Sequence, residues 1–217
     1  MHIVRSIWTK PRAALREVIN NNSFLLPFII LYLGSVGSGM FTLIDSQGMD
    51  FSSDFTTDVP MDTFEIPLLV SFIGVLVLSP IFYFITATIY AFFTMLFGKW
   101  LFKGTGKYKD LLKVNATSYL PFAFAIPVLG IWLLVSPDSL VDTQNTGIAG
   151  SILIFLLGIF TIIYYFIINL VGISEAHQIS KWKAFFTMMI PTIIFFIIIF
   201  IIFALLFLIL FALFAVA

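Results

Sequence analysis

The sequence predicts an all-α, polytopic integral membrane protein with five transmembrane helices, and three observations support this fold class. First, 61% of the 217 residues are hydrophobic and only 10% are charged, whereas soluble domains carry about 25% charged residues. Second, five stretches without a charged residue are each long enough to cross a bilayer, which takes about 20 apolar residues in a helix. Third, the basic residues are segregated from most of the acidic ones along the chain. Soluble enzymes, nucleic-acid binders and secreted disulfide scaffolds are therefore excluded, the last because the chain has no cysteine.

The connections between the apolar stretches are too short for an independent soluble domain, so we expect residues 1–217 to form one membrane domain. Tryptophan prefers membrane boundaries because its ring is amphipathic, and all four tryptophans lie near predicted ends of spans. These tryptophans are Trp8, Trp100, Trp132 and Trp182. The predicted spans are residues 24–44, 67–97, 114–135, 148–171 and 185–217.

The distribution of charge predicts the orientation of these spans, because basic residues are retained on the cytoplasmic side of a membrane. With five crossings, the N-terminal segment, the second loop and the last loop fall on one side, and together they hold every Lys and Arg. The first outer loop, residues 45–66, contains six carboxylates and no basic residue. We therefore expect a cytoplasmic N-terminus and an external C-terminus. The basic residues are Arg5, Lys10, Arg12, Arg16, Lys99, Lys103, Lys107, Lys109, Lys113, Lys181 and Lys183.

The N-terminal segment, residues 1–22, has the pattern of a short amphipathic helix. Pro11 suits the first position of a helix, since it has no N–H to donate. Apolar residues then recur at helical spacing opposite Arg12 and Arg16. This pattern predicts a helix lying on the anionic inner leaflet. The apolar residues are Ala14, Leu15, Val18 and Ile19.

Two spans carry packing or bending signals. Pro80 in the second span predicts a kink near Ser79. A break into two crossings at Pro80 is rejected, because it would place the second loop, which holds five lysines between residues 99 and 113, on the outer side of the membrane. In the first span, small residues four apart favour close packing within the bundle, with a dimer face as the alternative. The small pairs are Gly34 with Ser38 and Ser35 with Gly39.

The two long loops do not carry a complete ligand-binding motif. The acidic loop, residues 45–66, reads as a solvated segment, with a low-affinity calcium site as the alternative, but it has no Asp-x-Asp-x-Asp-Gly pattern. Gly106 and Lys107 echo a phosphate-binding loop. However, Leu101 and Tyr108 occupy positions where that motif requires Gly and Ser or Thr. We expect the lysines of this loop to contact lipid headgroups.

The spans themselves offer no recognisable catalytic chemistry. They contain no Asp, Glu, His, Lys or Arg residue, so intramembrane aspartyl proteases and zinc proteases are excluded and proton-coupled transport is disfavoured. His177 has no second histidine at metal-ligand spacing. We therefore expect no catalytic residue, no metal and no cofactor. The most polar residues in or beside the spans are Asn115, Asn169, Tyr119, Tyr164 and Tyr165.

Three segments resemble the Yip membrane family, named for proteins that interact with Ypt/Rab GTPases. They are the opening IWTKPRAALREVI, the loop and helix KGTGKYKDLLKVNATSYLP, and the turn GISEAHQISKWKAFF before the last helix. The matching positions in chain order are Trp8, Pro11, Gly104, Gly106, Tyr108, Tyr119, Pro121, Gly172, Ala176, His177 and Ala184.

The resemblance implies five membrane helices and a membrane organiser or adaptor rather than an enzyme. The Asp-Leu-Tyr-Gly-Pro motif of eukaryotic members is absent, and the chain is similar to the bacterial branch, some members of which accompany ABC-type exporters. We expect a multi-pass plasma-membrane protein that contacts the bilayer and another membrane protein, with a homo-oligomer left open and no nucleic acid. A small transporter or channel for a weakly polar solute is the alternative. The candidate partner or lipid contacts are Trp8, Arg12, Arg16, Lys107, Lys109, Lys181 and Lys183.

Overall fold

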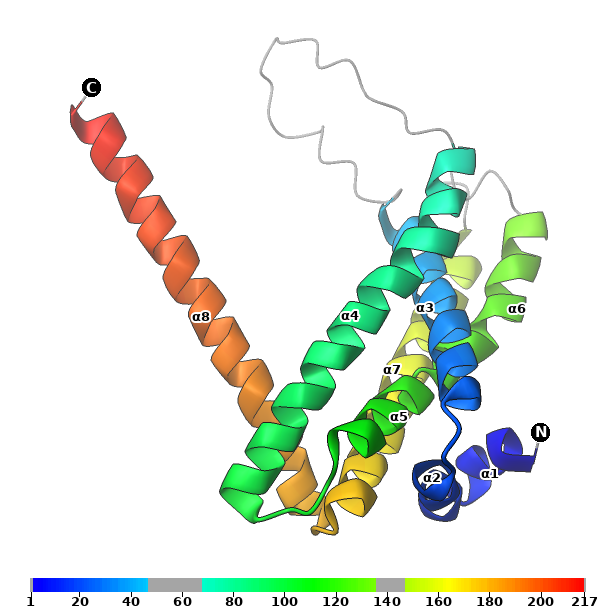
Figure 1. Ribbon diagram of the computed structural model, residues 1–217. Coiled ribbons are helices and arrows are strands. Elements are labelled where there is room, and N and C mark those ends of the chain that lie inside the picture. The colour runs from blue at the N-terminus through cyan, green and yellow to red at the C-terminus, as the bar shows by residue number, and fades with distance from the viewer. Residues whose placement is uncertain (1, 47–67, 136–146, 217) are drawn as a thin grey trace.

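The computed structural model describes residues 2–46, 68–135 and 147–216, and its regular structure in these ranges is entirely helical (Figure 1). The predicted all-α class is therefore confirmed. The acidic loop lies outside the described residues from residue 47 onward, and so does its candidate cation site. In chain order the helices are α1 His2–Thr9, α2 Pro11–Asn20, α3 Leu25–Ser46, α4 Leu68–Phe102, α5 Tyr108–Ser118, α6 Leu120–Val135, α7 Gly147–His177 and α8 Lys181–Val216.

Five helical segments are long and apolar enough to cross a membrane, which confirms the predicted number of spans. They are α3, α4, the consecutive pair α5–α6, α7 and α8. Helix α4 continues through Pro80 without interruption, so the second span is a single crossing. Several helices extend past the predicted ends of the spans. Helix α7 continues to His177 rather than to residue 171, because its last polar side chains find partners in the protein.

The predicted third span, residues 114–135, lies within a longer helical stretch that is divided in two. The helix begins at Tyr108 and is divided at Tyr119 into α5 and α6. Pro121 has no N–H to bond to Thr117, which is a physical reason for the division at this place. Lys113, which was expected to contact lipid headgroups, is consequently inside α5 and only 4% exposed.

Helix α2 begins with Pro11 at its first turn, as predicted. Its apolar face, however, is covered by protein and does not lie free on a leaflet as the sequence suggested. Ala14 and Leu15 are buried in one cluster with Ile30 of α3 and Ile168 of α7. The amphipathic pattern was therefore interpreted correctly as a helix but assigned to the wrong apolar surface. Helix α1, which precedes α2, adds Ile7 to the same cluster.

The small residues of α3 pack inside the bundle and not on a free face. A Cβ atom added at Gly34 or Gly37 would collide with the backbone at Tyr119 or Phe122, where α5 meets α6. Gly39 is equally close to Ser79 of α4. The alternative of a dimer face through these residues is thus disfavoured. Helix α8, by contrast, leaves the bundle and diverges from α4 along most of its length (Figure 1).

Candidate functional site

The three segments that carry the family resemblance meet at one end of the bundle, which we call the basic end. It consists of α1, α2, the end of α4, residues 103–107, the first half of α5, the turn between α7 and α8, and the start of α8 (Figure 1). All eleven Lys and Arg residues of the chain belong to these segments. The structure therefore brings the motif residues to one end of the bundle, although the sequence did not show how they contact one another.

Glu175, near the end of α7, forms an ion pair with both arginines of α2. Its carboxylate accepts a hydrogen bond from Arg12 Nε, and two from Arg16, at 3.2 Å from Nε and 2.8 Å from Nη2. The Glu175 side chain is only 3% exposed, while Arg12 and Arg16 are 66% and 61% exposed. Because the arginines are four residues apart, they lie on one face of α2 and reach the same carboxylate. This pair attaches α2 to α7.

His177, the last residue of α7, is held in a cradle of three glycines. A Cβ atom at Gly98, Gly104 or Gly106 would approach the imidazole ring within 3.0 Å, so each glycine makes room for the ring. Gly106 N–H donates to Nδ1 at 3.2 Å, and Nε2 lies 3.1 Å from the carbonyl oxygen of Thr94. These partners fit the neutral tautomer with its proton on Nε2.

The backbone beside His177 completes this joint. Thr105 N–H donates to the carbonyl oxygen of His177 at 3.1 Å, so the 103–107 segment is bonded to α7 through both the ring and the main chain. Gln178 follows with a φ of 57°, and Ile179 N–H bonds back to Ser174. This is a Schellman ending, and it turns the chain directly into α8.

Lys113 connects α5 to the end of α2. Its ammonium group donates to the carbonyl oxygens of Ile19, at 3.2 Å, and of Asn21, and it lies 5.1 Å from the ring centroid of Phe24. The last carbonyls of a helix carry partial negative charge, so a buried cation is stabilised there. Lys113, which was expected to contact lipid headgroups, therefore makes its contacts within the protein.

Trp8 lies among aromatic rings and is not a free interfacial side chain. Its ring centroid is 5.3 Å from that of Phe124, 6.0 Å from that of Phe160 and 5.1 Å from that of Tyr164. These contacts attach α1 to α6 and α7. Gly172 of the third motif meets Val114 of α5 so closely that a side chain there would collide. Four other candidate contacts, Lys107, Lys109, Lys181 and Lys183, are largely solvent-accessible.

A buried polar layer lies deeper in the bundle, between α4, α5 and α7. Asn115 Nδ2 donates to the carbonyl oxygen of Ala87 at 3.2 Å, and its Oδ1 accepts from the Tyr165 hydroxyl at 3.4 Å. Asn169 Nδ2 donates to the same hydroxyl at 3.4 Å. Tyr119 packs edge-to-face on Tyr165, with ring centroids 5.1 Å apart. These polar residues, which the sequence singled out, are thus brought together.

The geometry fits structural pairing better than catalysis. Within the described ranges, no three His, Asp or Glu side chains are grouped so that they could hold a metal ion. Sequence reasoning missed Glu175 and the three-glycine cradle. A usable signal was present for Glu175, because it is the one acidic residue between Gly172 and Lys183 and two arginines share one face of the predicted helix.

The comparison with known protein families agrees with this arrangement. A family model described as the Yip1 domain matches residues 5–203, which include all three motifs and the five spans up to the middle of α8. No curated protein and no solved structure matches the chain. Because the family model covers most of the sequence, the chain belongs to the Yip1 domain family, and it is a multi-pass membrane protein.

Proposed function

We propose that this protein is a non-enzymatic adaptor of the plasma membrane. Its basic end faces the cytoplasm and binds another membrane protein. The partner class that we favour is an ABC-type exporter, which rests on the resemblance to bacterial Yip members. The orientation rests on the charge distribution.

The observation that carries this proposal is that some charged residues of the basic end form contacts within the protein while others remain exposed and unpaired. Glu175, Arg12, Arg16 and Lys113 are engaged in contacts that join three segments of the chain. Lys107 and Lys109 remain exposed and form no ion pair within the described part of the chain. A rigid scaffold that presents unpaired cations is suited to recognise an acidic protein surface, since complementary charge guides association.

Co-purification in mild detergent, followed by mass spectrometry, tests the adaptor role. We expect one membrane protein to accompany the wild-type chain and to be lost from the charge-reversed variant K107E/K109E. The charge-retaining variant K107R/K109R should keep it and is the matched control. Repeated recovery of the chain alone, or equal recovery of the partner with K107E/K109E, would contradict the proposal.

A small transporter for a weakly polar solute is the second candidate, and a groove between α3 and α4 favours it. This groove has a volume of about 410 Å³, and glycines and hydroxyl groups line it on a largely apolar background. One of these hydroxyls, Tyr83 Oη, is 2.7 Å from Ser38 Oγ. Residues that line the groove include Gly39, Thr42, Ser71, Gly74, Ser79 and Tyr83.

Flux into liposomes containing the purified protein tests this alternative. Gly74→Leu should fill the groove without a clash, because a Cβ atom there meets nothing within 4 Å. Gly130→Leu is the matched control, since Gly130 is equally open and lies outside the groove. A transporter predicts solute flux that G74L abolishes and G130L retains. An adaptor predicts no flux in any of the three proteins.

A further inference from the structure

Helices α4 and α8 meet at the basic end and then diverge, forming what we call the α4–α8 fork (Figure 1). Near its start α8 is packed against the bundle, where Ala184 and Met188 are buried beside Ala91 of α4. Beyond Thr192 its described side chains are exposed or half-exposed around the whole helix. Much of α4 is also exposed, including Ile81, Phe82 and Ile89. Within the described part of the chain, no protein covers the two arms.

The α8 arm of the fork is suited to acyl chains rather than to another helix. Helices that associate inside a bilayer use small residues four apart or polar side chains that bond across the contact. From Ile193 to Val216, α8 contains no polar residue and no pair of small residues four apart. A second copy of the chain would find no recognisable packing motif on this arm, whereas lipid requires none.

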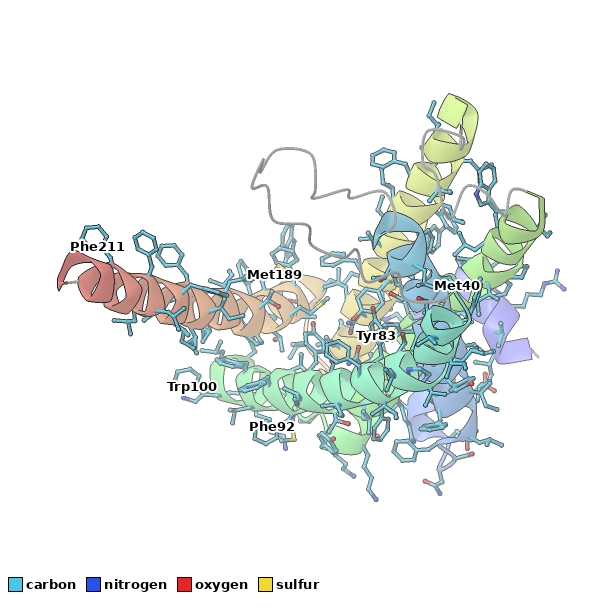
Figure 2. All side chains as sticks on the ribbon, turned by 90° about the horizontal axis from the view of Figure 1, so that it is seen from above. Met40, Tyr83, Phe92, Trp100, Met189 and Phe211 are labelled. Carbon is cyan, nitrogen blue, oxygen red and sulfur yellow. The ribbon has the colours of Figure 1, made fainter. Side chains whose placement is uncertain are left out.

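The base of the fork has the opposite character. Lys99 lies in the last turn of α4 and Lys103 directly follows that helix, while Lys181 and Lys183 lie at the start of α8. All four lysines are exposed. Neither helix contains an Asp or Glu residue. Two tryptophans flank these lysines, Trp100 at 74% and Trp182 at 76% exposure. Figure 2 shows Trp100 at the end of α4 and Phe211 near the far end of α8.

We propose that the α4–α8 fork is a binding site for anionic phospholipid. The acyl chains lie along the apolar arms, and the phosphate group is bound by the four lysines at the base. Lysine is suited to this position because its alkyl chain stays along the apolar surface while the ammonium group reaches the headgroup. A zwitterionic lipid offers the same acyl chains but adds a cation next to the lysines, so the site discriminates by headgroup charge.

Quenching of tryptophan fluorescence by brominated lipids tests this site directly, because Trp100 and Trp182 lie at its base. The background variant W8F/W132F leaves these two as the only tryptophans. In phosphatidylcholine vesicles, brominated phosphatidylglycerol should reach half-maximal quenching at about a tenfold lower mole fraction than brominated phosphatidylcholine. Native mass spectrometry of the purified protein should show phosphatidylglycerol bound in preference to phosphatidylcholine.

Substitution of the lysines at the base of the fork tests whether they cause this preference. K181Q/K183Q should remove most of this tenfold preference, because each lysine near the headgroup contributes to binding an anionic lipid. R5Q/K10Q is the matched control, since it removes the same charge on α1 and beside α2, away from the fork, and it should keep the preference. Equal quenching by both lipids would overturn the proposal, as would equal effects of the two variants. Protection of both tryptophans from either lipid would indicate a protein in the fork and would also overturn it.

Discussion

The buried carboxylate of Glu175 lies between two guanidinium groups that are largely exposed, and this asymmetry determines what each substitution does. When the carboxylate is lost, the guanidinium groups remain solvated by water, so the protein loses little stability. When both arginines are lost, a charge that is 3% exposed has no partner. An unpaired buried charge is far more destabilising than an exposed one, because its desolvation is not compensated.

We therefore expect R12Q/R16Q to lower the free energy of unfolding by about 2 kcal/mol and E175Q to lower it by less than about 1 kcal/mol. Thermal unfolding in detergent measures the difference. The triple variant R12Q/R16Q/E175Q should be more stable than R12Q/R16Q, because the unpaired carboxylate is gone. Equal losses for the arginine and glutamate variants would show that the pair is not buried as described.

The cradle around His177 gives a second test at the residue scale. Replacing a glycine within a helix by alanine normally stabilises the helix by about 1 kcal/mol. At Gly98 the added methyl group would meet the imidazole ring within 3.0 Å, so we expect G98A to destabilise the protein by about 2 kcal/mol. The unfolding temperature in detergent measures the stability of G98A and of the control variant G74A. G74A, in the same helix and with open space at its Cβ, should stabilise it.

A double variant shows whether the ring is responsible. H177A removes the imidazole, so G98A should lower the free energy of unfolding much less in the H177A background than in the wild type. If G98A destabilises both backgrounds equally, the clash involves another group and the cradle is misassigned. Hydropathy could not have revealed this contact, because it depends on three glycines in two segments meeting one ring.

At the scale of elements, Lys113 attaches the N-terminal helices to the bundle. Its ammonium group bonds to the carbonyl oxygens at the end of α2, and it does so from the interior of α5. The span predicted from the sequence begins at residue 114, whereas the helix that holds Lys113 begins at Tyr108. The contact itself was missed, because the charge pattern that predicts orientation treats every lysine as solvated.

We expect K113M to loosen α2 while the transmembrane helices remain formed, because the methionine keeps the apolar stem but cannot bond to the two carbonyls. Amide hydrogen exchange in residues 11–20 should become about tenfold faster. K109M is the control, since Lys109 lies four residues earlier in α5 and is exposed. Unchanged exchange in α2, or the same change with K109M, would argue against Lys113 as the attachment.

Across the whole molecule, hydropathy was enough to predict the number of spans, because a bilayer imposes one requirement on every crossing helix. Element ends were harder to predict. Helix α7 continues to His177 and α5 begins before Val114, since their polar residues are satisfied by other segments of the chain. The amphipathic face of α2 was misassigned for a related reason: an apolar stripe shows that a surface is covered but not what covers it.

The orientation of the whole molecule can be tested because the chain has no cysteine. Lys109→Cys introduces one thiol at the basic end, and Asp45→Cys introduces one at the far end of α3. With a membrane-impermeant maleimide on intact cells, we expect labelling of D45C and no labelling of K109C until the cells are opened. Labelling of K109C in intact cells would reverse the orientation on which the adaptor proposal depends.

Because most of α8 does not pack against the bundle, a small rotation near its start moves its far end by a larger distance. The helix is held by its first three turns, and the part beyond Thr192 extends for about 36 Å at 1.5 Å per residue. A rotation of about 10° at Thr192 therefore displaces the tip by about 6 Å, because the displacement grows with the length of the arm. A change too small to disturb the packing around Ala184 is amplified into a movement larger than one helical turn at the other side of the membrane.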